Sequence, residues 1–321
     1  IGLGQIGASV GLALASQPEL VKRIGHDKQS AVMQKARQLG AVDRTENNLI
    51  SAVREADLVF LSLPLDQIRP TLEFISQDLI EGAVVMDTAP VKEVVRQWAK
   101  DMLPPGRHYI GLTPVLNRAY LHDIYAGIES AHSDLFQRGL IAITTTAETD
   151  SQAIKVAADL TRLLGAFPLF ADQAEMDGIL ASTNLLPSLL AAALLNATVG
   201  QPGWTDGRKI AGRAYAEATG PMALLPSPAA LAEQAIHNRE NALRVIDGLT
   251  AALQSIRSDI LKGDEKSLVE RLERAQNGRE AWWKQRQVGE WRSEEMGAQP
   301  EMPKTKDIFG NLVGFRRKPK S

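Results

Sequence analysis

The feature that most constrains this chain is a glycine-rich turn at its amino-terminal end. The segment Gly2-Leu3-Gly4-Gln5-Ile6-Gly7 has the spacing G-x-G-x-x-G and stands between a strand-like segment and a small-residue helical stretch, Ala8 to Ser16. In such a unit the first glycine permits a tight turn, the second lets the backbone approach a pyrophosphate, and the third brings the helix close to the sheet. The first amides of the helix then face the phosphates. We therefore expect Gly2, Leu3, Gly4, Gln5, Ile6 and Gly7 to bind a dinucleotide, with only the end of the first strand present.

An acidic residue follows where this unit needs one. Val21 to Gly25 indicates a second strand, and Asp27 comes directly after it. A carboxylate about 20 residues beyond the glycine turn can accept hydrogen bonds from the adenosine ribose and repels a 2′-phosphate. NAD is therefore favoured, and NADP stays open because Lys28 lies next to Asp27. The alternative is a glycine turn and a surface carboxylate without a ligand.

Strand and helix patterns alternate over the first part of the chain. This alternation predicts a Rossmann α/β domain, doubly wound around a mostly parallel sheet, over residues 1–171. Two strands end at Leu63-Pro64 and at Asp87, and open parallel sheets bind ligands at the carboxyl ends of their strands. We expect these three residues to contact the cofactor, although Pro64 is also explained as loop punctuation. The other strands are expected at 141–144 and 167–170.

The pattern changes after Asp172, where strand signals end and helical periodicity takes over. We expect an all-helical substrate and dimerisation domain over residues 172–287, followed by a polar, basic tail over 288–321. Ala229 to Leu261 keeps helical spacing over an unusual length, which favours packing against other helices across a homodimer. The apolar stretch Leu185 to Leu195 is too short to span a membrane and indicates a buried helix.

Composition excludes several classes of protein. With 36 Lys and Arg against 38 Asp and Glu, a net charge of −2 gives no basic field for nucleic acid. The absence of cysteine excludes disulfide scaffolds, thiolate zinc sites and a cysteine nucleophile. We expect a cytoplasmic protein without a membrane span or a metal, whose partner is a small-molecule carboxylate.

Several further segments together resemble the prephenate/arogenate dehydrogenase family of tyrosine biosynthesis. The resemblance covers roughly residues 1 to 285 in domain order, and it lies in the glycine turn and five further groups of residues. These are Gly25-His26-Asp27, Ala56-Asp57-Leu58-Val59, Asp87-Thr88-Ala89-Pro90-Val91-Lys92, Gly111-Leu112-Thr113-Pro114, and the later set Asp177, Ala181, Leu186-Pro187 and Asp206-Gly207-Arg208-Lys209-Ile210-Ala211. The resemblance implies oxidative decarboxylation of prephenate or arogenate. Hydride passes to the nicotinamide, a base takes the hydroxyl proton, and loss of CO2 makes the ring aromatic.

The chain departs from the family pattern at its polar anchors. The family's histidine falls at Thr113, its substrate-binding arginine at Lys209, and its serine at Pro90. Two further family histidines correspond to Met176 and Leu185, and Leu185 follows Asn184. Threonine cannot replace imidazole as a general base, and lysine lacks the bidentate fork that arginine offers a carboxylate. The cofactor half is therefore retained, while the substrate half is rebuilt.

Other residues offer replacements for the missing groups. His122 and His132 lie near the Thr113 segment with carboxylates close in sequence, so either is a candidate base, although histidines on a surface loop are the favoured explanation. We expect the substrate to be bound by Arg208, Lys209, Asn184 and Arg213. Two other functions stay open: a related dehydrogenase acting on a different carboxylate, with Lys209 as its base, and a catalytically silent NAD-binding regulatory protein.

Overall fold

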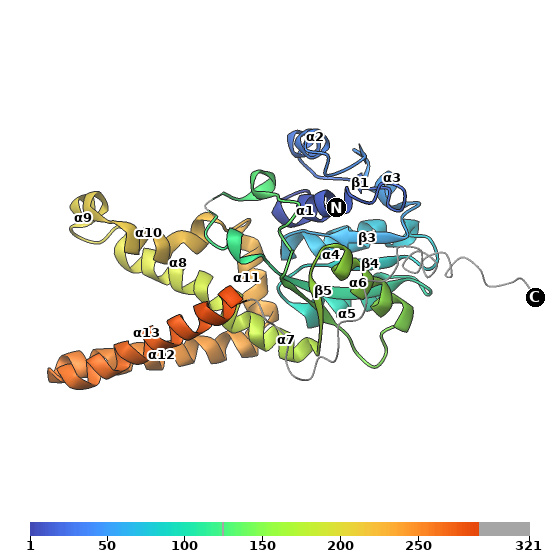
Figure 1. Ribbon diagram of the computed structural model, residues 1–321. Helices are drawn as coiled ribbons and strands as arrows, with labels where there is room; N and C mark the ends of the chain where they lie inside the picture. Colours follow the sequence, from blue (N-terminus) through green and yellow to red (C-terminus); the bar gives the residue numbers. More distant parts are fainter. Residues whose placement is uncertain (124, 289–321) are drawn as a thin grey trace, which may run out of the picture.

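The computed structural model describes residues 1–123 and 125–288, and Figure 1 shows an α/β domain from which two helical arms project. The main sheet has five strands in chain order, β3 (Leu58–Leu61), β4 (Val84–Asp87), β5 (His108–Val115), β6 (Leu140–Thr144) and β7 (Phe167–Ala171). All neighbouring strands are parallel except the pair β5 and β6. A second parallel pair is formed by β1 (Ile24–Gly25) and β2 (Arg44–Thr45).

The first residues of the chain join the two sheets. The amide of Ser62 donates to the carbonyl of Ile1, and the amide of Gly2 donates to the carbonyl of His26, each at 2.9 Å. Ile1 and Gly2 therefore lie between β1 and β3 in the position of a central strand. This places the glycine turn at the carboxyl edge of the sheet, which is where the sequence predicts it.

Helices cover both faces of the sheet. One face carries α1 (Gln5–Leu14) and α6 (Ser151–Leu163), and the other carries α4 (Leu65–Ile75) and α5 (Lys92–Met102). Successive residues of β4 show this division, because Val84 and Met86 pack into the first core while Val85 packs into the second. The helices α2 (Ser30–Gln38) and α3 (Leu49–Val53) flank the edge formed by β1 and β2. The predicted Rossmann fold class is confirmed.

The second half of the described chain is helical. From α7 (Gln173–Leu180) the chain passes through a π-helical stretch, Ala181–Leu185, into α8 (Leu186–Thr198). One arm consists of α8 with α9 (Trp204–Ile210) and α10 (Arg213–Ala223), and α11 (Pro228–His237) packs back on α4. The other arm pairs α12 (Arg239–Lys262) with α13 (Glu265–Val288), and both arms point away from the sheet in Figure 1.

Several expectations about individual elements need correction. The strand β5 was not predicted, and the continuous helix expected over 229–261 is broken at Asn238. The stretch Leu185 to Leu195 is helical but mostly not buried, because Leu185 and Ala191 are its two buried residues in the single chain. By length and composition alone, the helical stretch Gln173–Thr198 could cross a membrane, and 22% of its apolar 18-residue window is buried. The chain changes from sheet to helix after Ala171, as the sequence predicts, but the exact domain boundaries stay predictions. The predicted tail lies outside the described residues from 289 onward.

Candidate active site

The glycine turn has the shape that a pyrophosphate needs. Gly2 has φ +80°, and a Cβ on it would lie 2.2 Å from the carbonyl oxygen of Ser62, so only glycine fits. A Cβ on Gly7 would lie 2.0 Å from the carbonyl oxygen of Gly2, which is the close approach between helix and strand. A Cβ on Gly4 would meet nothing within 4 Å, although Gly4 directly precedes α1. The open space at Gly4, in front of the first helical amides, fits the phosphates of a dinucleotide.

Asp27 stands next to this turn. Its Oδ2 accepts a hydrogen bond from the amide of Leu3, and its Oδ1 accepts one from the amide of Gln29, both at 2.9 Å. Each carboxylate oxygen can accept a second hydrogen bond, so both remain able to bind ribose hydroxyls. Asp27 therefore fixes the turn and lies where the adenosine end of the cofactor is expected.

The ends of β3 and β4 lie beside the turn. Pro64 directly precedes α4, and the side chain of Leu63 lies 2.9 Å from the position of a Cβ on Gly2. Both residues can contact a dinucleotide in this place. Asp87 is completely buried and its carboxylate is bonded within the protein, so its part in cofactor binding stays a prediction and would act through the turn after β4.

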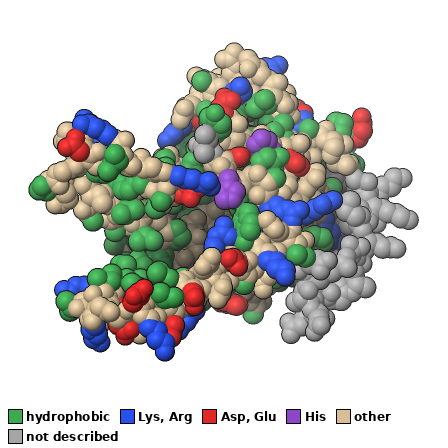
Figure 2. Space-filling view, turned by 60° about the vertical axis from the view of Figure 1, so that its left-hand side comes forward, with side chains coloured by type: hydrophobic (Ala, Val, Ile, Leu, Met, Phe, Trp, Pro, Cys, Tyr) green, Lys and Arg blue, Asp and Glu red, His purple; other side chains and the backbone are tan. Residues whose placement is uncertain are grey.

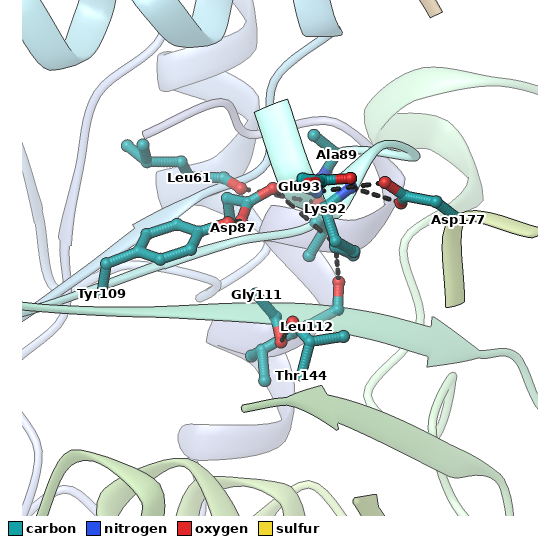
Figure 3. Close-up of polar contacts among 11 residues, drawn as sticks. Leu61, Asp87, Ala89, Lys92, Glu93, Tyr109, Gly111, Leu112, Thr144 and Asp177 are labelled. Carbon is teal, nitrogen blue, oxygen red and sulfur yellow. Dashed lines mark hydrogen bonds and ion pairs between the residues drawn. The ribbon is translucent and has the colours of Figure 1, made fainter. Parts of the chain in front are cut away.

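A buried polar network surrounds Asp87, as Figure 3 shows. Asp87 accepts hydrogen bonds from the amide of Ala89 at 2.6 Å and from the hydroxyl of Tyr109 at 2.5 Å. Its Oδ1 lies 3.8 Å from Nζ of Lys92, a completely buried ammonium that donates to the carbonyl of Leu112 at 2.6 Å. This network ties the turn after β4 to the end of β5.

Burial dominates the electrostatics of the network. It lowers the pKa of Lys92, and the nearby carboxylates of Asp87 and Asp177 act in the opposite direction. It raises the pKa of Asp87, which Lys92 and the hydrogen bond from Tyr109 partly offset. Removing either partner of this ion pair would leave an uncompensated buried charge.

Asp177 reaches this network from the helical domain. It lies on α7 with 4% exposure, and its two carboxylate oxygens accept from the amides of Lys92 at 2.6 Å and Glu93 at 3.1 Å. These are the first two amides of α5, whose own N-cap residue, Val91, makes no side-chain hydrogen bond. Burial raises the pKa of Asp177, and the two amide hydrogen bonds partly offset that shift.

Thr113 occupies the end of β5 directly after this network. It pairs with Ala142 of β6, and its buried Oγ1 has no hydrogen-bond partner among the described residues. The hydroxyl can therefore bind a polar group of a ligand or a water molecule, but it has no group that titrates near neutrality. No cluster of three metal-ligating side chains occurs within residues 1–123 and 125–288.

The loop between β5 and β6 carries His132. Its ring stacks on Tyr120 with centroids 4.1 Å apart, and its Nε2 lies 3.6 Å from Oδ2 of Asp123. The amide of His132 donates to Oγ of Ser9 on α1 at 2.9 Å, which ties the loop to the glycine-turn helix. An imidazole oriented by a carboxylate is the arrangement expected of a general base.

His122 lies in the same loop but faces the helical domain. Its ring centroid is 5.4 Å from that of Trp283 on α13, and its charge would act on Glu217 of α10. The two histidines therefore occupy different sides of the loop. The backbone of His132 is anchored to α1 while its ring packs within the loop, and the ring of His122 lies near α13.

The predicted substrate-binding cations do not converge on the glycine turn within one chain. Lys209 pairs with Asp206 at 2.7 Å on α9, and Arg213 pairs with Glu217 at 2.7 Å on α10, both on the surface, and Arg208 is also exposed. Figure 1 shows α9 at the far tip of its arm, away from α1. Asn184 lies in the π-helical stretch, where its Oδ1 accepts from Gln234 at 3.0 Å.

Taken together, the sheet, the open cradle at Gly4 and the acid at Asp27 define a dinucleotide-binding oxidoreductase domain joined to a helical domain. The sequence profile for "Prephenate dehydrogenase, nucleotide-binding domain" matches residues 10–167. The chain belongs to the prephenate/arogenate dehydrogenase family, as the sequence motifs predict, and it is an NAD(P)-dependent oxidoreductase.

Individual relatives agree with this assignment. A prephenate dehydrogenase of Bacillus subtilis is 25% identical over 281 residues, which cover 87% of this chain and 74% of the relative. A cyclohexadienyl dehydrogenase of Zymomonas mobilis is 28% identical over 281 residues, which cover 87% of this chain and 93% of the relative. The fold is shared with a prephenate dehydrogenase of Aquifex aeolicus solved in complex with hydroxyphenyl propionate and NAD+, with TM-score 0.75 and 22% identity over 87% of this chain and 96% of that one.

Sequence reasoning did not identify the buried network. Lys92 was recognised only as part of a family segment, and the roles of Tyr109 and Asp177 were missed. The one available signal was a lysine five residues after an acid at the end of a strand. The contact between Lys92 and Asp177 spans 85 residues of sequence, so no local pattern could reveal it.

Proposed function

We propose that this protein catalyses NAD-dependent oxidative decarboxylation of prephenate or arogenate. The observation that carries the proposal is the open cradle at Gly4 in front of α1, flanked by Asp27. Gly2, Leu3, Gly4, Gln5, Ile6 and Gly7 would hold the pyrophosphate, and Asp27 would hold the adenosine ribose. When bound, the nicotinamide supplies the acceptor for the hydride that leaves the hydroxyl-bearing ring carbon. The chain's own residues must orient the ring, bind its carboxylates and accept the hydroxyl proton.

For the proton acceptor we propose His132, because Asp123 and Tyr120 orient its ring and Ser9 anchors its backbone to α1. The substrate hydroxyl would give its proton to the imidazole as the hydride leaves. Cleavage of the bond to CO2 would supply the electron pair that makes the ring aromatic, and the imidazolium would return the proton to the phenolate oxygen. Thr113 would bind the substrate or cofactor through its unpartnered hydroxyl. His122 is the second candidate and serves as the matched comparison.

We propose a homodimer formed through the helical arms. Figure 2 shows hydrophobic side chains gathered on both arms and in the hollow between them. The exposed large hydrophobic residues of the helices that form the arms include Leu190, Val199, Ile210, Leu224, Leu243, Leu253, Ile260, Leu261 and Leu272. An apolar surface of this extent on helices is typical of an obligate interface. Asp177, inside the apolar stretch 173–198, is bonded to α5, which argues against a membrane span in that stretch, and we propose a cytoplasmic protein, as the sequence analysis expects.

The dimer also accounts for the distant cations. We propose that Arg208, Lys209 and Arg213 reach the cleft of the second copy and bind a substrate carboxylate there, while Asn184 lines the helical side of the cleft. Lysine and arginine side chains on an arm tip are well suited to this role, because their present partners, Asp206 and Glu217, are exposed and easily exchanged.

The direct test measures NADH formation by the purified protein with prephenate and with arogenate, each with NAD and with NADP. Turnover with either substrate supports the proposal. NADH binding without turnover of any carboxylate would instead favour a catalytically silent regulatory protein. This is the second candidate function, because Thr113 stands where the family has its histidine. In a pH–rate profile the rate should fall at acidic pH, because the base takes up a proton there. His132→Gln should remove this acidic limb of the profile, whereas His122→Gln should keep it.

Subunit mixing tests the shared site. Gly4→Ala and Lys209→Ala subunits, assayed at an NAD concentration at which neither turns over appreciably alone, should regain about one quarter of wild-type activity when mixed, because half of the dimers then contain one intact cleft. If Lys209 acts within its own chain, every cleft in the mixture keeps a defect and no activity returns.

A further inference from the structure

The contact between Asp177 and α5 crosses the boundary between the two domains. Asp177 belongs to α7, the first helix after the sheet, whereas Lys92 and Glu93 begin a helix of the nucleotide-binding domain. A helix start leaves amides unsatisfied, and in most helices a residue immediately before the helix satisfies them. Here Val91 and Pro90 offer no side-chain acceptor, and the helical domain supplies a carboxylate instead.

The contact continues through Lys92 to the end of β5. Nζ of Lys92 donates to the carbonyl of Leu112 at 2.6 Å, and Leu112 precedes Thr113. Beside it, a Cβ on Gly111 would lie 3.1 Å from Cδ of Lys92 and 2.4 Å from Oγ1 of Thr144, so the chain has no space to shift here. Lys92 therefore connects α7, the turn after β4 and Leu112 of β5.

The other side of α7 is also fixed. Nδ2 of Asn238 donates to the backbone carbonyl of Asp177 at 2.8 Å, and Asn238 stands at the break between α11 and α12. Arg244 of α12 donates to the carbonyl of Gly178 at 3.4 Å. The helix pair that forms one arm is thereby tied to the residue that caps α5.

We propose that Asp177 is a positioning residue that holds the helical domain in register with the nicotinamide end of the cleft. By capping α5 it fixes the turn Thr88-Ala89-Pro90, and through Lys92 it fixes the end of β5 that carries Thr113. The inference rests on the proposed function, because it places these two segments on either side of the reacting groups. Asp177 touches neither substrate nor cofactor in this scheme, and the glycine turn lies outside its contacts.

This scheme separates catalysis from cofactor binding. Small displacements of the groups that orient a substrate lower the rate of the chemical step steeply, whereas the cradle at Gly4 does not depend on α7. Loss of Asp177 should therefore lower kcat with little change in the affinity for NADH. A role in stability alone would lower the melting temperature and leave kcat of the folded fraction unchanged.

The test compares Asp177→Asn and Asp177→Glu in the full chain, with Glu175→Gln as the control on the exposed side of α7. Asparagine keeps the shape of the side chain but loses the negative charge, and its single oxygen cannot replace both carboxylate oxygens as acceptors for the amides of Lys92 and Glu93. We expect kcat to fall by about tenfold or more, NADH affinity to stay within about twofold, and Asp177→Glu to recover part of the rate. Unchanged kcat in Asp177→Asn, or equal losses in kcat and NADH affinity, would overturn the proposal.

Amide hydrogen exchange gives a second readout that does not need turnover. In Asp177→Asn the first amides of α5 and the amides of residues 111–113 should exchange several-fold faster, while residues 2–7 stay as in the wild type. If the wild type turns over neither prephenate nor arogenate, the proposed function fails, and the exchange pattern still decides the positioning role. Exchange that rises equally across the whole chain, or at none of these amides, would refute it.

Discussion

Alanine substitutions at Gly4 and at Gly7 of the amino-terminal turn should change the stability of the free protein in opposite directions. Gly4 has φ −71°, which alanine adopts without strain, and its Cβ would stand in open space. Gly4→Ala should therefore leave the free protein folded and even stabilise it by about 0.4–1 kcal/mol, because alanine restricts the unfolded chain. The same methyl group would occupy the space proposed for the pyrophosphate.

The expected loss of affinity follows from the contacts that the methyl group prevents. A hydrogen bond between a backbone amide and a charged group contributes about 1.5–3 kcal/mol. Losing one such bond raises the Kd for NADH by about 10- to 150-fold, since each 1.4 kcal/mol corresponds to about a factor of ten. In Gly7→Ala the Cβ would lie 2.0 Å from the carbonyl oxygen of Gly2, so the free protein should lose about 1–3 kcal/mol of stability.

Two measurements on each variant separate these effects. Urea denaturation gives the free energy of unfolding, and fluorescence titration gives the Kd for NADH. Gly278→Ala on the exposed helix α13 is the control, because it should gain about 1 kcal/mol in stability at unchanged Kd. If Gly4→Ala binds NADH as tightly as the wild type, the open space at Gly4 does not hold the pyrophosphate, and the reasoning about the turn is wrong.

Three further outcomes are expected. Gly111→Ala should lower the free energy of unfolding by about 1–3 kcal/mol in urea denaturation, because its Cβ would lie 2.4 Å from Oγ1 of Thr144; a stability equal to the wild type would show that the network can relax. The hydrogen bond to Asp134 raises the pKa of Tyr120 from 10.0 to about 12, so this bond contributes stability below pH 10 that is lost as the pH rises through about 12. In ultraviolet titration, Asp134→Asn should bring the phenol back toward its ordinary range, and an unshifted titration would contradict the assignment. Leu253→Asp, on the surface proposed for dimerisation, should give a monomer in light scattering, whereas Leu39→Asp on the nucleotide-binding domain should not.

The elements that sequence alone predicted are those with local signals. Val84–Asp87 is buried on both faces, Leu58–Leu61 is an apolar run buried on one face and half-buried on the other, and the glycine turn requires its spacing for steric reasons. The strand His108–Val115 was missed because Gly111 and Pro114 interrupt its pattern, although Gly111 is required there by the approach of Thr144. The helix break at Asn238 has no glycine or proline to mark it, because its cause is a tertiary hydrogen bond to Asp177.

The candidate site divides in the same way. The cofactor half is a local motif, and its geometry follows from sequence spacing. The substrate half depends on how distant segments meet. The stacking of His132 on Tyr120 and the position of Lys209 at the tip of an arm are properties of loop closure and helix packing, which a linear pattern does not contain.

Because α5 begins on a carboxylate from beyond Ala171, we expect the sheet and the helices that follow it to fold as one unit. A fragment that stops at residue 171 keeps every strand of the sheet but exposes the start of α5 with two amides unsatisfied. Lys92 would lose a nearby negative charge in the same step. The nucleotide-binding half and the helical half should consequently melt in one cooperative transition, and neither is a self-sufficient module for transplantation into another enzyme.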